Sequence, residues 1–163
     1  GDVIVFKTPA DNRTDYIKRL IGIPGDKIQF INGEIYLNKK KIKREIFKNT
    51  FKINCGANVY KIKAYTETLP NDTTYNSVYH DSNTIVNTDL YTVPPNHYFF
   101  MGDNRDCSKD SRFLSSVGYV HFNNLVGKAQ IIFFSNDTKK GNILQFWKWH
   151  KSIRFERFMK KIK

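Results

Sequence analysis

The sequence has little of what marks a membrane-spanning, disulfide-rich or metal-binding protein. Its 163 residues include only two cysteines, Cys55 and Cys107, in no CxxC pair, so we expect neither a disulfide framework nor a cysteine-based zinc site. The four histidines fall in no ligand spacing such as HExxH. No apolar run approaches the about 18 residues that a transmembrane helix needs. The sequence therefore predicts no metal site, no cofactor and no membrane-spanning helix within residues 1–163.

An initiator methionine and a cleavable leader are also missing. The first residues, GDVIVFK, look like a β-strand and not like the basic, apolar and small-residue regions of a signal peptide. We therefore expect the sequence to begin inside a longer protein. Hydrophobic residues make up 40% and aromatic residues 15% of the chain, which is enough for a folded core and excludes global disorder.

The formal net charge of +12 is concentrated in two segments. Residues 139–163 carry nine Lys and Arg against Glu156, and residues 39–48 carry six against Glu45. The rest of the chain is close to neutral. Such segments are either ordinary solvated surface or places that attract anionic lipid or nucleic acid, and composition alone leaves these alternatives open.

Short apolar runs rich in Val, Ile, Phe and Tyr, separated by turn residues, predict an all-β fold of mainly antiparallel sheets. Asn32-Gly33 is the strongest hairpin signal, because both residues accept a positive φ. No amphipathic helix of 12 or more residues is predicted. The expected strands are Val3–Lys7, Tyr16–Ile21, Lys27–Ile31, Glu34–Leu37, Val59–Ala64, Thr84–Val86, Leu90–Val93, Tyr98–Met101, Gly118–His121 and Lys128–Phe134.

Composition divides the chain into a main domain and an insertion. Residues 38–90 are rich in Lys, Asn and Thr and poor in apolar residues, whereas the flanking segments have cleaner strand patterns. We therefore predict a main β domain built from residues 1–37 and 91–163, with a smaller β-rich subdomain inserted at residues 38–90.

The segment Asp15–Gly22 places two cations, Lys18 and Arg19, in an otherwise apolar strand. Side chains alternate between the two faces of a strand, so one of these cations must point toward apolar neighbours if the strand is half-buried. Burial lowers the pKa of a lysine, and a neutral lysine amine is a general base, which arginine is not. The alternative is that Lys18 extends its charged end to solvent at a sheet edge.

A polar, charged segment, Met101–Arg112, follows an apolar strand. Its aspartates alternate with Arg and Lys, so the charges can compensate one another, and an ordinary surface loop is one interpretation. The aspartate spacing does not match an EF-hand calcium loop, and the three cations argue against a calcium site.

Together these segments resemble the successive boxes of bacterial type I signal peptidases. The resemblance is carried by GDVIVF at the start, DYIKR followed by GIPGD, MGDNRD-x-S-x-DSR at residues 101–112, and NLVGKA at residues 124–129. It covers roughly residues 1–30 and 91–135. The long Gly-Asp box combined with the Tyr-Ile-Lys-Arg box is highly specific.

The resemblance implies a serine endopeptidase with a Ser–Lys dyad. Lys18 inherits the role of general base, and Ser108 inherits the role of the serine that hydrogen-bonds and orients it. Asp110 and Arg112 are expected to form an ion pair that holds the loop, with Arg105 as the other possible partner of Asp110. Because Cys55 falls in the insertion and Cys107 beside the base, we expect these two cysteines not to be bonded to each other.

The resemblance also implies a substrate and a location. The family removes signal peptides from exported preproteins, binding the substrate as an extended strand and accepting small residues in an Ala-x-Ala pattern before the cut. We accordingly expect a membrane-bound enzyme of the bacterial cytoplasmic (inner) membrane, with its catalytic domain on the outer, periplasmic face and an anionic membrane surface as partner.

One departure from the family pattern concerns the nucleophile. The family's nucleophilic serine lies in a Ser-x-Met-x-Pro-Thr motif upstream of the first Gly-Asp box, and no serine of this sequence carries that motif. The expectation is therefore an active parent enzyme and a fragment that is inactive alone, because loss of the nucleophile costs many orders of magnitude in kcat.

Two alternative functions are compatible with the composition of the chain. The first alternative is a basic β module that binds nucleic acid, which would require cations spread along one face of a sheet. The predicted sheets are near neutral, so no nucleic-acid partner is expected. A related Ser–Lys peptidase with other substrates is the second alternative. In the tail, residues 152–158 alternate at period two, which predicts a strand closing the sheet against residues 1–7, while Trp147 and Trp149 are candidates for a lipid interface.

Overall fold

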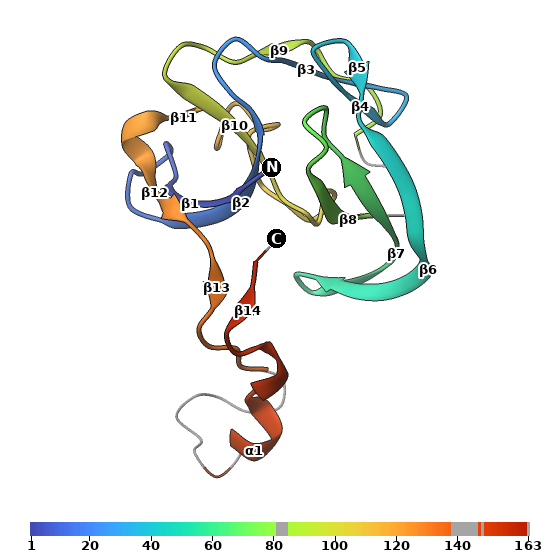
Figure 1. The fold of residues 1–163 in the computed structure, drawn as a ribbon, viewed down its shortest axis with the longest axis vertical. Coiled ribbons are helices and arrows are strands. Elements are labelled where there is room, and N and C mark those ends of the chain that lie inside the picture. Colours follow the sequence, from blue (N-terminus) through green and yellow to red (C-terminus); the bar gives the residue numbers. More distant parts are fainter. Residues whose placement is uncertain (81–84, 138–146, 148, 163) are drawn as a thin grey trace. The chain divides into compact units, whose positions relative to one another are not determined.

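A computed structural model describes residues 1–80, 85–137, 147 and 149–162 of the chain (Figure 1). Within these residues the chain forms two compact units, Gly1–Lys128 and Ala129–Lys163. Strands dominate, and every pair of neighbouring strands is antiparallel, so the predicted all-β fold is confirmed.

The first unit contains a five-stranded antiparallel sheet with the order β11-β10-β2-β1-β12. In this sheet β2 lies between β1 and β10, with Ile4 opposite Lys18 and Met101 opposite Arg19. The central position of β2 thus brings the Tyr-Ile-Lys-Arg segment beside the start of the polar loop that follows β10. The strands are β1 (Val3–Lys7), β2 (Asp15–Gly22), β10 (His97–Met101), β11 (Val120–His121) and β12 (Leu125–Lys128), with a 3-10 turn, η1 (Phe122–Asn124), before β12.

A second sheet of four strands has the order β5-β4-β3-β9. Asn32 and Gly33 join β3 to β4 with φ values of 50° and 76°, so the hairpin that the Asn-Gly pair predicts is present. The strands are β3 (Lys27–Ile31), β4 (Glu34–Leu37), β5 (Lys40–Lys41) and β9 (Tyr91–Thr92).

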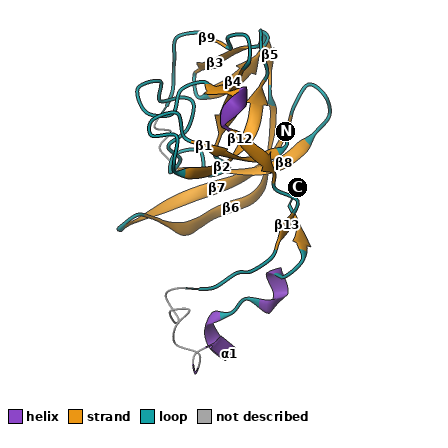
Figure 2. Ribbon diagram, turned by 90° about the vertical axis from the view of Figure 1, so that its left-hand side faces the viewer, coloured by secondary structure: helices purple, strands orange, loops and turns teal. Residues whose placement is uncertain are grey.

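The third sheet, of order β6-β7-β8, comes from the middle of the chain. It consists of β6 (Lys43–Cys55), β7 (Asn58–Thr68) and β8 (Thr74–His80), and Figure 2 shows β6 and β7 as a long hairpin. Sequence patterning predicted only part of β7, because the polar composition of β6 and β8 hides their alternation. The predicted strand at Thr84–Val86 is wrong for residues 85 and 86, which form no strand, while Thr84 lies outside the described residues.

Two apolar clusters form the core of the first unit. One joins the first and second sheets through residues such as Ile28, Phe30 and Phe99. The other contains Phe6 and Phe100, whose rings stack with centroids 4.7 Å apart. Full burial of each such ring contributes about 1.5–3 kcal/mol, so these clusters fix the position of the central strand β2.

The second unit contains β13 (Ile131–Ile132) paired with β14 (Lys160–Lys161), and the short helices α1 (Trp149–Ser152) and η3 (Phe155–Arg157). The predicted tail strand at residues 152–158 is therefore wrong. A physical reason is that β1 already has β2 on one side and β12 on the other, which leaves no free edge for a further strand. None of the helices in the described part of the chain is long and apolar enough to cross a bilayer.

Candidate active site

Lys18 lies on the face of β2 that packs toward the second apolar cluster. Alternation puts it on the same face as Tyr16 and Leu20, both of which contact the cluster of Phe6 and Phe100. The side chain is half-buried, and its Nζ lies 5.3 Å from the centroid of the Tyr16 ring. The lysine is thus held beside apolar and aromatic groups instead of extending freely into solvent.

Burial lowers the pKa of Lys18, and the charge of Asp110, which favours the ammonium form, is not enough to restore it. Arg112 lowers the pKa further, and Asp103 opposes that effect. These charges all come from the loop after β10, so the loop and the lysine amine share one electrostatic environment. Among the described residues Lys18 has no hydrogen bond or ion pair.

Arg19, the neighbouring cation, is the more deeply buried of the two, with 3% of its surface exposed. Its Nε and Nη2 donate to the two carboxylate oxygens of Asp103 at 2.7 and 2.8 Å, and Nη1 donates to the Gly1 carbonyl oxygen at 2.6 Å. A guanidinium suits this forked arrangement, whereas a single amine does not. The two cations of β2 therefore differ in role: Arg19 ties the strand to the loop, whereas Lys18 forms no ion pair with any residue that the structure describes.

Asp110 and Arg112 form the predicted ion pair, which is confirmed. Arg112 Nε donates to Asp110 Oδ1 at 2.8 Å and Nη2 donates to Oδ2 at 2.8 Å, and both side chains are buried. Asp110 Oδ2 also accepts a hydrogen bond from the Gly102 backbone at 2.8 Å, and Arg112 donates to the Arg105 carbonyl oxygen. The pair thereby joins both ends of the loop.

Ser108 lies buried within the same loop. Its hydroxyl oxygen has no hydrogen-bond partner among the described residues, so the structure shows no hydrogen bond between Ser108 and Lys18. The Ser108 side chain packs directly against Gly102, where any Cβ would collide with it. Gly102 is thus required sterically, and the orienting role of Ser108 stays a prediction.

Arg105 pairs with Glu67 of β7 and not with Asp110. Its Nη2 lies 2.7 Å from Glu67 Oε2, and both side chains are essentially unexposed. Nη1 and Nη2 also donate to the hydroxyls of Tyr79 and Tyr75 at 2.8 and 3.2 Å, while Tyr79 donates to Glu67 Oε1 at 2.5 Å. Sequence reasoning missed Glu67, because an acidic residue inside a polar segment gives no sign that it is buried.

We expect this pair to make the stability of the protein sensitive to acid. Burial alone raises the pKa of Glu67, but the charge of Arg105 and hydrogen bonds from hydroxyls such as that of Tyr79 outweigh it, so the folded-state pKa is lowered. The stabilisation is then present above the unfolded-state pKa of about 4.3 and is lost as pH falls through the lower folded-state value. The free energy of unfolding, measured in urea at several pH values, should fall less steeply at acidic pH in Glu67→Gln than in the unchanged protein. An equal fall in both would contradict the role of Glu67 in acid sensitivity.

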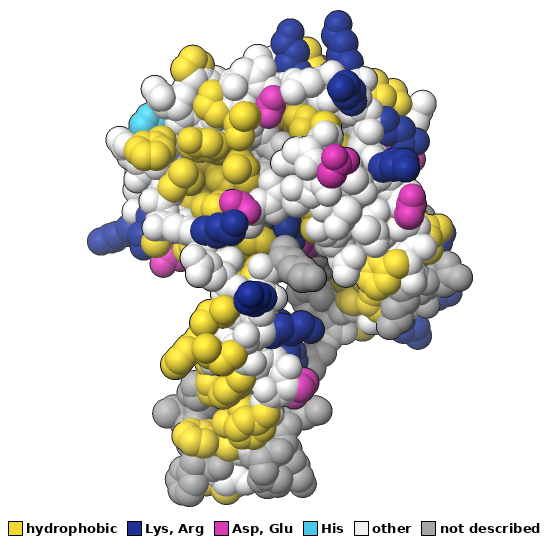
Figure 3. Space-filling view, in the orientation of Figure 1, with side chains coloured by type: hydrophobic (Ala, Val, Ile, Leu, Met, Phe, Trp, Pro, Cys, Tyr) yellow, Lys and Arg dark blue, Asp and Glu magenta, His cyan; other side chains and the backbone are white. Residues whose placement is uncertain are grey.

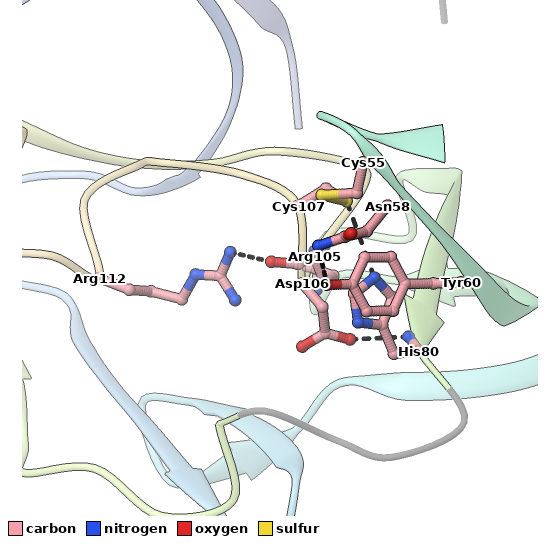
Figure 4. Close-up of a disulfide and its surroundings, with 8 residues drawn as sticks. All are labelled: Cys55, Asn58, Tyr60, His80, Arg105, Asp106, Cys107 and Arg112. Carbon is pink, nitrogen blue, oxygen red and sulfur yellow. Dashed lines mark hydrogen bonds between the residues drawn. A yellow bond between two sulfur atoms is a disulfide. The ribbon is translucent and has the colours of Figure 1, made fainter. Parts of the chain in front are cut away.

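Cys55 and Cys107 form a disulfide, with their Cα atoms 5.8 Å apart (Figure 4). The expectation that they are unbonded is therefore wrong. The β6–β7 hairpin carries Cys55 to its tip, and β8 runs beside the loop through backbone hydrogen bonds between Val78 and residues Asp103 and Arg105 at 2.8 and 2.9 Å. Sheet pairing over long sequence distances thus brings the insertion and the loop together, which sequence spacing does not reveal.

Comparison with known proteins places these residues in a family. The profile described as "Signal peptidase, peptidase S26" matches residues 1–134. Proteins named signal peptidase I from Rickettsia akari, R. conorii and R. prowazekii are 42%, 42% and 43% identical over 99% of this chain. The chain spans 64–65% of the length of these relatives.

A solved structure of a signal peptidase I from Enterococcus faecalis V583 is 24% identical and covers 78% of this chain and 92% of its own, with a TM-score of 0.45. The profile match includes both the strand that carries Lys18 and the loop from Gly102 to Arg112. On the strength of the profile match, the chain belongs to the signal peptidase family, peptidase S26.

Proposed function

We propose that this chain supplies the general base and substrate-binding edge of a serine endopeptidase that removes signal peptides from exported preproteins. One observation carries the proposal: Lys18 is a half-buried lysine with a lowered pKa, next to the family's Gly-Asp-Asn-Arg-Asp loop, and it pairs with no carboxylate in the part of the chain that the structure describes. A lysine kept only for structure would normally be paired or solvated.

In the proposed reaction the neutral Lys18 amine takes the proton from a serine hydroxyl as its oxygen attacks the scissile carbonyl carbon. The resulting ammonium then gives that proton to the leaving amine of the mature protein, and the freed amine activates a water molecule that hydrolyses the acyl ester. The resemblance assigns the attacking hydroxyl to the serine of the Ser-x-Met-x-Pro-Thr motif, which no serine of residues 1–163 carries. Ser108 acts as the positioning residue for the base.

The substrate is expected to bind along β2. On one side β1 pairs with residues 15–19 of β2, but on the other side β10 pairs only with residues 19–22. Within the described strands, residues 15–18 of β2, which include the proposed base Lys18, therefore have no partner strand on that side. An extended peptide can add to such an edge through backbone hydrogen bonds, with alternate side chains entering pockets.

Cleavage assays on the complete gene product test this proposal. A peptide carrying Ala-x-Ala before the cut should be hydrolysed at that bond, and a matched peptide with Phe in place of both Ala residues should not. Ser108→Ala should lower kcat with little change in KM, because Ser108 acts through Lys18 and not on the substrate. Equal cleavage of both peptides, or none of either, would overturn the proposed specificity.

The enzyme is proposed to work at the outer, periplasmic face of the bacterial cytoplasmic membrane. The Cys55–Cys107 disulfide supports this location, because disulfides persist in oxidising compartments outside the cytoplasm. Exposed apolar side chains of the second unit support contact with the membrane surface, and Figure 3 shows apolar groups gathered on the segment that contains β13 and β14. The exposed apolar side chains of the second unit include Phe133, Phe155 and Met159, whose exposed fractions are 80%, 63% and 65%.

We predict that Trp147 and Trp149 strengthen binding to anionic membranes. Their side chains are 59% and 44% exposed, and indole rings favour the membrane–water interface. In vesicle co-sedimentation, the chain should bind anionic vesicles better than neutral ones, and added salt should weaken that binding. The double variant Trp147→Ala/Trp149→Ala should bind less, whereas Phe47→Ala, which removes an exposed ring from the first unit, should not change binding. Equal sedimentation of the double variant and the unchanged chain would refute the prediction.

A further inference from the structure

A cluster of three potential metal ligands lies beside the loop that carries Ser108. The Sγ atoms of Cys55 and Cys107 and a ring nitrogen of His80 all lie within 4.8 Å of one another. The Cys107 Sγ to His80 Nε2 distance is 3.7 Å. Two ligands of a tetrahedral zinc ion, one sulfur at about 2.3 Å and one nitrogen at about 2.0 Å, lie about 3.5 Å apart, so the sulfur and the nitrogen already have nearly the spacing of two zinc ligands.

The ring of His80 is held in place before any ion arrives. It is 7% exposed and stacks on Tyr60, with ring centroids 4.2 Å apart and planes 9° from parallel. The His80 backbone donates a hydrogen bond to Asp106 Oδ2 at 2.8 Å, which anchors the end of β8 to the residue before Cys107 (Figure 4). A fixed ring whose nitrogen faces a sulfur atom lowers the entropic cost of forming a metal site.

The three residues come from three separate segments: Cys55 ends β6, His80 ends β8, and Cys107 lies in the loop after β10. A search for ligand spacing along the sequence cannot find them, and the fold brings them together. We propose that Cys55, Cys107 and His80 form a zinc-binding site when the disulfide is reduced, with a solvent molecule completing the coordination.

Reduction supplies the two thiolates that the site needs. Two equivalents of a small thiol, RSH, convert the protein disulfide into two cysteine thiols and leave RSSR as the oxidised product. A divalent zinc ion then displaces the two thiol protons and binds both sulfur atoms and the neutral His80 nitrogen. Both cysteines are partly exposed, so a small thiol and a metal ion can reach them.

Cys55 and Cys107 connect the β6–β7 hairpin to the loop in either redox state. In the oxidised protein the disulfide ties the β6–β7 hairpin tip to the residue next to Ser108. In the reduced protein a zinc ion makes the same connection and adds β8 through His80. The loop beside the proposed base would thus remain anchored before the disulfide has formed or after it has been reduced.

Titration of the purified chain with Co²⁺, a coloured substitute for Zn²⁺, tests the proposal. After reduction with a phosphine and removal of oxygen, we expect one Co²⁺ per chain, with sulfur-to-cobalt charge-transfer absorption and the visible bands of tetrahedral cobalt. Added Zn²⁺ should displace the Co²⁺ and raise the Tm of the reduced chain. The oxidised chain should show no charge-transfer absorption.

Variants separate the three ligands from general metal binding. Cys107→Ser should abolish the charge-transfer absorption, and His80→Ala should weaken Co²⁺ binding at least about tenfold, since even outer-shell partners of a metal contribute about 10–100-fold. His80→Ala keeps the disulfide, so its fold can be checked in the oxidised form. His97→Ala, which changes a half-buried histidine whose ring meets that of His121 edge to face, should bind Co²⁺ normally. Absent thiolate bands in the reduced chain, or full-affinity binding by His80→Ala, would overturn the proposal.

Discussion

Lys18→Ala is expected to lower kcat/KM for signal-peptide cleavage by the complete gene product by about 10³–10⁶-fold, the range for loss of an essential base. Lys18→Arg should be nearly as inactive, because a guanidinium stays charged at any pH at which the protein is folded. The reason lies in the chemistry of the amine: it is half-buried, its pKa is lowered, and no carboxylate of residues 1–80, 85–137, 147 or 149–162 is paired with it.

The stability of the Lys18→Ala variant distinguishes a catalytic role from a structural one. Since Lys18 makes no ion pair or hydrogen bond among the described residues, the Tm should stay close to that of the unchanged protein. Lys61→Ala, which removes an exposed lysine from β7, serves as the matched control and should retain activity. Cleavage by Lys18→Ala within about tenfold of normal would remove Lys18 from the mechanism.

Asp110→Ala is expected to reduce the free energy of unfolding by about 3–5 kcal/mol, the usual cost of removing one partner from a buried ion pair. The Arg112 guanidinium would remain buried without its carboxylate, and the Gly102 backbone amide would lose its acceptor. Urea unfolding measures the change as a lower midpoint.

A surface ion pair provides the control for this stability prediction. Asp15 lies 2.8 Å from Lys7, but both side chains are substantially exposed, at 58% and 41%. Exposed pairs contribute about 0–1 kcal/mol, so Asp15→Ala should change the unfolding midpoint little. If Asp110→Ala were as mild as Asp15→Ala, the buried pair would not hold the loop.

Local patterns predicted much of the first unit. The strands at Val3–Lys7, Lys27–Ile31 and Glu34–Leu37 have the predicted bounds, because apolar alternation and turn residues act over only a few positions. The Asp110–Arg112 pair was predicted as well, since the two partners are close in sequence and belong to one family box.

Long-range contacts account for what the sequence did not show. Glu67 reaches Arg105 across 38 residues of sequence, and Cys55 reaches Cys107 across 52. Both contacts depend on the register of the β6-β7-β8 sheet, where the pairing of β6 with β7 shifts at two places. The polar, lysine-rich composition of residues 38–90 gives no sign of such pairing. The sequence therefore did not predict that this segment contacts the loop at residues 101–112.

The tail illustrates a different failure. Alternation over residues 152–158 matched a strand, but the described tail forms α1, η3 and the short β13–β14 pair instead. A single seven-residue pattern has no information on which sheet edges are free, and both edges of β1 are occupied.

The pKa of Lys18 in the folded chain tests the central claim most directly. Selective isotope labelling of lysine, with the Lys18 resonance identified from its absence in Lys18→Ala, allows the amine to be titrated by NMR without substrate or nucleophile. Burial should place the pKa of Lys18 below that of a lysine in a short unstructured peptide measured under the same conditions. A value equal to or above that of the peptide lysine would contradict the assignment of Lys18 as the general base.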